Sequence, residues 1–183
     1  MKKEKNKKTT KVEKEEYSKT IIWSENFQKI VEFYLFECPV EEVSSRATTF
    51  AEKGWKGHYF TTLKARMLNV ASKDLKKRYY PCKKEELESR FTEMEKLKKG
   101  EEYCVFLKHD EKRVMESLYK AIRNAFAHGS FKAGKDKGKT IYYFSNFEGY
   151  CKAQIQLKES TLLEWIEVFN SDPEEQKCKK QKS

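Results

Sequence analysis

The stretch that decides the fold expected of this chain is Asp110–Ser130, DEKRVMESLYKAIRNAFAHGS. Apolar residues recur along it at the spacing that lines one face of an α-helix. These residues are Val114, Leu118, Ile122, Ala125 and Phe126. Asp110 is suited to the N-cap position, and Gly129 to the position just past the C-terminal end. We therefore predict one amphipathic helix between these two residues, with its apolar side facing a core.

The polar side of this predicted helix carries the densest group of reactive side chains in the sequence. Arg123 and His128 flank a shallow trough, and Asn124 lies one turn before His128, within reach of its imidazole. A guanidinium binds phosphate oxygens through a planar fork, and an imidazole accepts and returns a proton near neutral pH. The spacing therefore suits phosphoryl chemistry. It also fits an ordinary solvated face with His128 at the helix end, where the helix dipole favours a cation.

The fuller string Arg-Asn-Ala-Phe-Ala-His-Gly, residues 123–129, resembles the signature of the HEPN superfamily, an R-x4-6-H motif at the end of a core helix. The resemblance implies a mainly α fold, a HEPN-like helical bundle, here with a small β-hairpin before the C-terminal helix. It also implies a metal-independent endoribonuclease without a cofactor, with Arg123, Asn124 and His128 as catalytic residues. A toxin branch of the family has Tyr two residues after the His, where this chain has Ser130.

In the mechanism that the resemblance implies, the 2′-hydroxyl of the RNA attacks the adjacent phosphate. His128 acts as the base or as the acid, and Arg123 stabilises the charge that builds on the phosphate oxygens. One histidine cannot easily take both roles, so a homodimer through the motif helix is expected to supply the second. The expected partners are an RNA substrate, a second copy of the chain and a possible antitoxin or regulatory partner. The expected role is that of a toxin or an anti-phage, abortive-infection effector.

Two other classes of function stay open at this point. The same cationic trough would serve a nonenzymatic module that binds RNA or a nucleotide, or that only dimerises. The chain would alternatively be an interaction protein whose charged helices assemble with partners. Formation of RNA products separates the enzyme from both alternatives.

The composition indicates how many domains, which disordered ends and which compartment to expect. The 183 residues carry a formal net charge of +10, and a chain of this length suffices for one domain with a core. We expect a disordered basic arm over residues 1–19, a single domain over 20–170 and a disordered tail over 171–183. The five cysteines are scattered without a C-x-x-C pair, so reduced thiols in a cytoplasmic protein are expected. No apolar run reaches membrane-spanning length.

Two basic segments outside the motif are candidates for RNA binding. Lys64–Lys84 interleaves cations with Tyr79 and Tyr80, a composition that grips phosphates and stacks bases, or else forms a basic loop whose tyrosines pack on the core. Lys132–Lys139 is expected to be a flexible cationic loop that steers phosphate or simply leads into a hairpin. The residues expected to contact RNA are Lys120, Lys132, Lys135, Arg78 and Tyr79.

Periodicity and end signals predict the remaining elements. Ser24 is expected to cap a helix that ends before Pro39, and Ser160 to cap the C-terminal helix. Residues 101–107 are expected to be a connector. The other expected elements are helices over Val40–Lys53, His58–Ser72 and Lys84–Lys99, and hairpin strands over Thr140–Phe144 and Tyr150–Leu157.

Overall fold

The computed structural model describes residues 21, 24–40, 48–98, 100–109 and 113–174. The expected N-terminal arm and the expected N-cap Asp110 lie outside these residues. So do positions 175–183 of the expected tail and positions 41–47 of the helix expected over Val40–Lys53.

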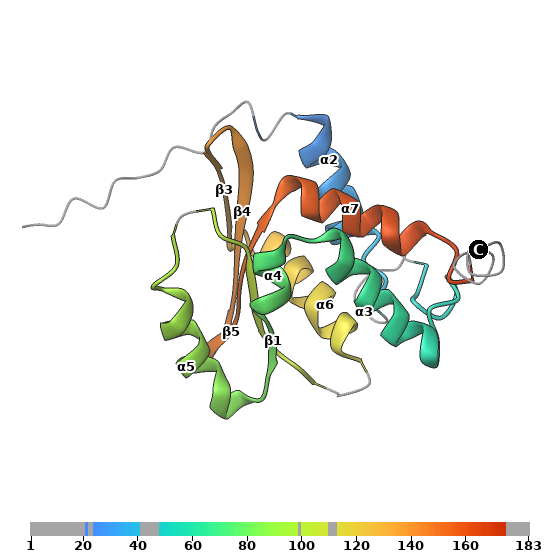
Figure 1. Ribbon diagram of the computed structural model, residues 1–183, viewed down its shortest axis with the longest axis horizontal. Helices are drawn as coiled ribbons and strands as arrows, with labels where there is room; N and C mark the ends of the chain where they lie inside the picture. The colour runs from blue at the N-terminus through green and yellow to red at the C-terminus, as the bar shows by residue number, and fades with distance from the viewer. Residues whose placement is uncertain (1–20, 22–23, 41–47, 99, 110–112, 175–183) are drawn as a thin grey trace, which may run out of the picture.

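A mixed five-stranded β-sheet occupies the middle of the molecule (Figure 1). Its strands follow the order β1-β2-β5-β4-β3, with β1 and β2 parallel and every other neighbouring pair antiparallel. They are β1 (Tyr79–Cys82), β2 (Tyr103–Leu107), β3 (Phe131–Asp136), β4 (Lys139–Glu148) and β5 (Tyr150–Lys158). The prediction of a mainly α, HEPN-like helical bundle is therefore wrong, because the chain has an α/β fold.

Helices cover both faces of the sheet (Figure 1). Helix α5 (Lys84–Met94) connects β1 to β2 and packs on one face, as the crossover of a parallel strand pair must. The other face is covered by α2 (Glu25–Val31), the π-helix η1 (Glu32–Phe36), α3 (His58–Val70), α6 (Val114–Ala127) and α7 (Glu159–Asn170). The short helix α4 (Lys73–Lys77) leads from α3 into β1.

Strand β2 joins the two hydrophobic cores that lie on either side of the sheet. Its sequence YCVFL is an unbroken apolar run, which is typical of a strand buried on both faces. Because successive side chains point to opposite faces, Cys104 and Phe106 belong to the core beneath α6, whereas Tyr103 and Val105 belong to the core beneath α5. The prediction of a connector at residues 101–107 is wrong, since a five-residue apolar run carries no periodicity that separates a strand from a linker.

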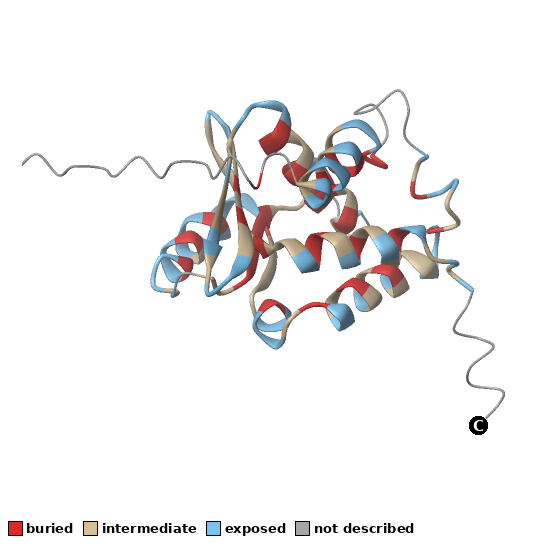
Figure 2. Ribbon diagram, turned by 90° about the horizontal axis from the view of Figure 1, so that it is seen from above, coloured by how far each residue is buried: buried red, intermediate tan, exposed pale blue. Residues whose placement is uncertain are grey.

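Aromatic side chains dominate the larger core, in which α6 is the central helix. Figure 2 shows buried and exposed residues alternating along the helices, as expected of helices that turn one side to a core. The ring centroids of Tyr34 and Tyr119 are 5.5 Å apart, and those of Phe50 and Tyr119 are 5.3 Å apart. Phe169 of α7 joins the same cluster, 5.4 Å from Phe50. This packing fixes α6 between the sheet and the other helices, with its polar side turned outward.

The predicted helices with clear apolar periodicity are present. Helix α3 confirms the prediction over His58–Ser72, and α5 confirms the predicted start at Lys84 but ends at Met94, before the expected Lys99. The Ser24 hydroxyl accepts a hydrogen bond from the Phe27 N–H at 3.2 Å, which confirms the predicted cap of α2. Ser160 is not the cap of α7, because that helix already begins at Glu159. Within the helix expected over Val40–Lys53, the described residues 48 and 49 have no regular structure and residues 50–53 form a turn, so no helix is present there.

Gly129 ends α6 as predicted. His128 is the C-cap residue, and Gly129 follows it with a φ of 63°, in the left-handed region that glycine adopts without strain. The Gly129 N–H donates to Phe126 O at 3.1 Å, and the Ser130 N–H donates to Ala125 O at 2.8 Å. These are the two hydrogen bonds of a Schellman motif. The chain consequently turns directly from α6 into β3.

The predicted hairpin is confirmed by β4 and β5, which turn at Gly149. Strand β4 is longer than expected and runs to Glu148. The cationic loop predicted over Lys132–Lys139 is wrong, because this segment is β3 followed by a two-residue turn into β4. Lys137 and Gly138 form that turn with φ values of 47° and 79°, the conformation that hairpins with two-residue loops favour.

Part of the expected C-terminal tail is held against α3. Arg66 of α3 donates from Nη1 to Asp172 O and from Nη2 to Pro173 O, both at 2.8 Å. The Tyr59 hydroxyl and the Glu174 carboxylate are 3.1 Å apart. These contacts hold residues 172–174 beside the helix, although the composition of the sequence predicts the beginning of a disordered tail there.

Candidate functional site

A small polar cleft lies between the outward face of α6 and the ends of three strands. Its volume is about 80 Å³. Helix α6 contributes Lys120 and Asn124, and the strands contribute side chains from the end of β4 and the beginning of β5. The polar residues that line the cleft are His109, Ser117, Lys120, Asn124, Asn146, Glu148 and Lys152.

A β-bulge places Lys152 in this cleft. Asn146 pairs with Ala153, but the next pair is Phe147 with Cys151, so Lys152 is the extra residue of β5. A bulge changes the direction in which a side chain points, and bulges are frequent beside functional sites. The Lys152 ammonium lies 2.6 Å from a Glu148 carboxylate oxygen across the hairpin.

Glu148 gathers positive charge around it. Its pKa is lowered, first by the hydrogen bond from Lys152 and the charge of that residue, and then by the charges of Lys120 and His128. These three residues come from β5, from the middle of α6 and from the C-cap of α6. The charges of Lys152, Lys120 and His128 therefore all act on the Glu148 carboxylate.

His109 brings an imidazole to the cleft, whose described lining does not include His128. The backbone N–H of His109 donates to the Ser117 hydroxyl at 3.2 Å, which ties the end of β2 to α6. Although much of the ring is exposed, one side lines the cleft. Partial burial lowers the pKa of His109, the charges of Lys120 and Lys152 lower it further, and Glu148 opposes them. His109 consequently stays neutral at a lower pH than a free histidine.

Helix α6 holds Arg123, Asn124 and His128 at its C-terminal end, in the order that the motif requires. His128 is exposed and Arg123 is half-buried. Arg123 Nη1 donates to Asn124 Oδ1 at 3.2 Å, whereas Asn124 and His128 are linked through the backbone, His128 N to Asn124 O at 3.0 Å. Arg123 also lies near the buried Cys38 thiol. Burial raises the pKa of Cys38 to about 11, and the positive charge of Arg123 acts in the opposite direction. The Asn124 side chain thus faces Arg123, and the expected hold of Asn124 on the His128 ring stays a prediction.

The five residues expected to contact RNA do not form one surface. Lys120 lines the cleft, whereas Lys132 and Lys135 lie on β3 and Tyr79 lies on β1, with Arg78 just before it. Strands β1 and β3 are the two opposite edges of the sheet. RNA gripped at both edges would therefore have to cross the width of the sheet.

The side chains of Tyr79 and Arg78 make contacts with other residues of the fold. The Tyr79 ring packs edge-on against Phe106, with 5.5 Å between the centroids, and its hydroxyl lies 3.3 Å from Met115 Sδ. Arg78 Nη1 lies 3.3 Å from a Glu101 carboxylate oxygen. For the basic segment over Lys64–Lys84, these contacts favour a tyrosine that packs on the core, but the expected loop is wrong, because the segment runs through α3, α4 and β1.

Besides Ser117 of α6, sequence reasoning missed four polar residues of the cleft, namely His109, Asn146, Glu148 and Lys152. In the sequence, His109 is only a residue that flanks the predicted motif helix. The other three belong to the hairpin, and no motif or spacing connects them to Arg123–His128. Only the pairing of the strands brings them to α6. The charged pair at positions 148 and 152, on either side of the Gly149 turn, was the one local signal.

The described part of the chain shows no metal site, disulfide or membrane-spanning helix. Within the described ranges, no three His, Cys, Asp or Glu side chains gather where a metal ion would need them. The described cysteines Cys38, Cys82, Cys104 and Cys151 are free thiols. None of the helices in the described part of the chain has the length and apolarity needed to cross a bilayer.

No family model, curated protein or solved structure matches this chain. The resemblance of residues 123–129 to the HEPN motif stays a prediction. The function is accordingly inferred from the side chains that the fold brings to the cleft.

Proposed function

We propose that this chain is a metal-independent endoribonuclease that cleaves RNA at the cleft between α6 and the β4–β5 hairpin. The observation that carries the proposal is that the His109 imidazole lines the cleft beside Lys120, Asn124 and Lys152, while His128 follows Asn124 by one turn at the C-cap of α6. Cleavage through the 2′-hydroxyl requires one group that removes a proton and another that supplies one. Lys120 and Lys152 stand beside the pair, where phosphate oxygens need positive charge.

In the proposed reaction, His109 is the base and His128 is the acid. The lowered pKa of His109 leaves its imidazole neutral near pH 7, so it accepts the proton of the 2′-hydroxyl. The 2′ oxygen then bonds to phosphorus, the bond between phosphorus and the 5′ oxygen breaks, and His128 donates a proton to the departing oxygen. The products are a 2′,3′-cyclic phosphate and a 5′-hydroxyl. Lys120 and Lys152 stabilise the negative charge on the phosphate oxygens.

This proposal changes the roles expected of Arg123 and of a dimer. Because the fold supplies a second histidine from the same chain, the chemistry no longer depends on a partner subunit. A homodimer through α6 stays a prediction of its own. Arg123 is half-buried and hydrogen-bonded to Asn124, so in the proposal it is a positioning residue that holds the Asn124 side chain at the cleft.

The decisive experiment incubates the purified chain with a mixed RNA pool in EDTA and analyses the ends of the products. We expect cyclic phosphate ends, and about a hundredfold or greater loss of rate in His109→Ala and in His128→Ala. His58→Ala is the matched control, because His58 is exposed at the start of α3 and is not among the residues that line the cleft. Loss of cleavage in EDTA, or equal losses in all three variants, would contradict the proposal.

The same experiment separates cleavage from binding alone. If Lys120 and Lys152 only hold phosphates, RNA binding will weaken steeply with salt and no product will form on long incubation. In that case His128→Ala would bind RNA as well as the unmodified chain does. A time course of product formation, measured beside a binding titration, distinguishes the two outcomes.

The role as a toxin or anti-phage effector is part of the same proposal. It is supported by the expected chemistry, since an endoribonuclease without a required metal or cofactor is active wherever RNA is accessible. Expression in bacterial cells should arrest growth, and the His128→Ala variant at the same protein level should not. Equal growth of the two strains would remove this part of the proposal while leaving the nuclease chemistry to the assay in solution.

A further inference from the structure

A second and larger cavity opens between the turn that precedes α3 and the first turn of α6. Its volume is about 660 Å³, which falls within the usual range of small-molecule sites. None of the described residues lines both this cavity and the cleft. The residues that set its chemistry are the aromatic Phe50, Trp55 and Phe60 and the cationic Lys56, Lys64 and Arg113.

The aromatic wall of this cavity is held rigidly. Phe50 is 3% exposed and Trp55 is 1% exposed. The Trp55 indole N–H donates to Phe169 O at 2.8 Å, and the Phe50 and Phe60 rings meet edge to face with 5.3 Å between centroids. Phe50 and Trp55 are thus buried supports of the wall, and the half-buried Phe60 ring is the aromatic surface that a planar ligand can reach. Because this ring is held in place, its use does not carry the entropic cost of ordering a side chain.

Cations surround that wall. Lys56 is exposed at the turn before α3, and Lys64 Nζ lies 5.3 Å from the centroid of the Tyr79 ring. Arg113 Nη1 lies 3.5 Å from Glu116 Oε2, with 58% of the Arg113 side chain exposed. Among the described residues that line the cavity, Glu116 is the one acid against these three cations. The cavity therefore favours an anionic ligand that also carries a flat apolar ring.

We propose that this cavity binds a nucleobase–phosphate unit, with the base against the Phe60 ring and the phosphate among the three cations. Either a free nucleotide or one nucleotide of an RNA strand presents this chemistry. The inference goes beyond the nuclease proposal, because it assigns a separate site at the other end of α6. A nucleotide there lies one helical turn from the cleft, since Arg113 and Ser117 are joined by the hydrogen bond from the Ser117 hydroxyl to Arg113 O at 3.4 Å.

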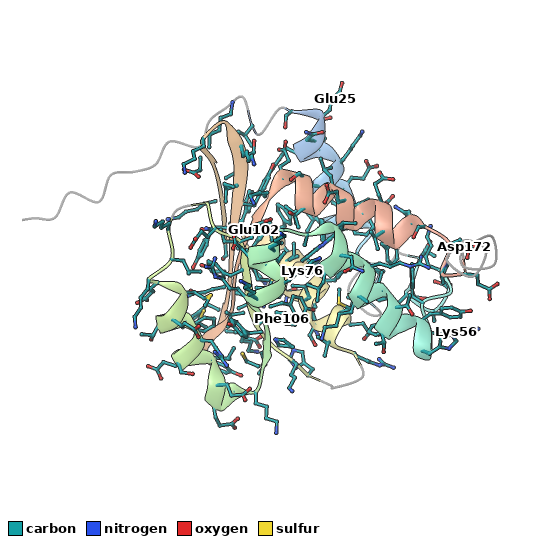
Figure 3. The ribbon with its side chains drawn as sticks, in the orientation of Figure 1. Glu25, Lys56, Lys76, Glu102, Phe106 and Asp172 are labelled. Atoms are coloured by element: carbon teal, nitrogen blue, oxygen red, sulfur yellow. The ribbon has the colours of Figure 1, made fainter. Side chains whose placement is uncertain are left out.

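Isothermal titration calorimetry of the full chain with AMP tests the site. The titration uses the His128→Ala background, so that a failure of the nuclease proposal does not affect it. We expect AMP to bind, adenosine to bind about tenfold more weakly, and Lys56→Gln and Arg113→Gln each to weaken AMP binding by roughly tenfold, as the loss of a charge-assisted contact does. Lys76→Gln on α4 is the matched control, because Lys76 lies at the other end of α3 from Lys56 and does not line the cavity (Figure 3).

A second variant tests the aromatic wall without removing charge. Thr61 is exposed on the first turn of α3 and lines the cavity, so Thr61→Trp should fill the space and weaken AMP binding by tenfold or more. A five-nucleotide single-stranded RNA then distinguishes the two sources. Tighter binding of this RNA than of AMP, with the same loss in Arg113→Gln, assigns the site to RNA; tighter binding of AMP assigns it to a free nucleotide.

Three results would overturn the inference. The first is the absence of AMP binding at millimolar concentration. The second is an unchanged dissociation constant in Lys56→Gln, Arg113→Gln and Thr61→Trp. The third is loss of AMP binding in Lys120→Gln with binding retained in Arg113→Gln, which would place the nucleotide in the cleft.

Discussion

At the scale of single residues, Glu102 joins the sheet to α7. Its side chain is 1% exposed and lies deep in the molecule (Figure 3). Thr161 Oγ1 donates to it at 2.6 Å, Lys158 Nζ at 3.0 Å and the Lys158 backbone N–H at 2.9 Å. Burial alone would raise the pKa of Glu102, but hydrogen bonds from Ser72, Thr161 and Lys158 outweigh it and lower the pKa.

Glu102→Gln should reduce the free energy of unfolding by about 2–4 kcal/mol, because it leaves Lys158 facing a neutral group in a buried network. The lowered pKa in the folded state means that the carboxylate stabilises the fold above the unfolded value of about 4.3 and loses this effect as the pH falls. Urea unfolding at pH 7 and at pH 3 measures both points. The exposed Glu88→Gln is the control. A difference between Glu102→Gln and the unmodified chain that does not shrink at pH 3 would contradict this account.

His109 gives a prediction with two opposite signs. Removing a nearby positive charge in Lys120→Gln should raise the pKa of His109, and removing a negative charge in Glu148→Gln should lower it. In the unmodified chain the pKa lies below the usual value of about 6.5, so protonation favours the unfolded state and stability rises with pH through that window. Titration of the His109 ring by NMR measures all three values. Shifts of the same sign in the two variants would show that the cleft is not assembled as described.

At the scale of elements, the C-terminal end of α6 connects the fold to the chemistry. Gly129 has a φ of 63°, and His128 occupies the C-cap beside it. A side chain at position 129 would meet open space but would force a left-handed backbone on a residue that resists it. The position of the His128 imidazole therefore depends on a glycine that contributes no chemistry.

Gly129→Ala should cost about 1 kcal/mol of stability through this backbone strain. The substitution should also lower the rate of RNA cleavage, because the last turn of α6, which positions His128, becomes less ordered. Gly134→Ala on β3 is the matched control, since its backbone is not left-handed and no atom lies within 4 Å of the added Cβ. Thermal unfolding and the RNA assay are measured on both variants. Equal effects of the two substitutions would be inconsistent with a specific role of the α6 terminus.

At the scale of the whole molecule, one sheet serves two cores. Phe91 and Leu87 of α5 pack on the face opposite to Leu118 and Ile122 of α6. Strand β2 contributes alternate side chains to both cores. Loss of this strand would therefore expose apolar surface on both sides of the sheet, so the two layers should unfold together. A shared central strand predicts cooperative unfolding of both layers.

Phe91→Ala and Leu118→Ala should each lower the free energy of unfolding by about 2–5 kcal/mol, the usual cost of a cavity in a core. Both should shift one and the same transition, followed by fluorescence and by circular dichroism. Phe147→Ala is the control, because this side chain is 72% exposed and its loss creates no cavity. A second transition that only Phe91→Ala shifts would instead show that α5 forms an independent layer.

The sequence by itself determined the elements whose signals are local. Helices α2, α3, α5 and α6 follow from apolar periodicity, and the caps at Ser24 and Gly129 follow from residue types that satisfy the ends of helices. The β4–β5 hairpin follows from alternation around a glycine turn. Each of these signals depends on residues within a few positions of one another, so a short window of sequence contains all of it.

Only the tertiary structure decided the sheet and the cleft. Strands β1, β2 and β3 are short, and their stability comes from partners distant in the sequence, such as the pairing of Val105 with Gln154. Likewise, His109 and Lys152 become neighbours of α6 through strand register and a bulge, neither of which leaves a pattern in the sequence. The physical reason is that strand pairing and burial are long-range interactions, whereas helix periodicity and capping are local ones.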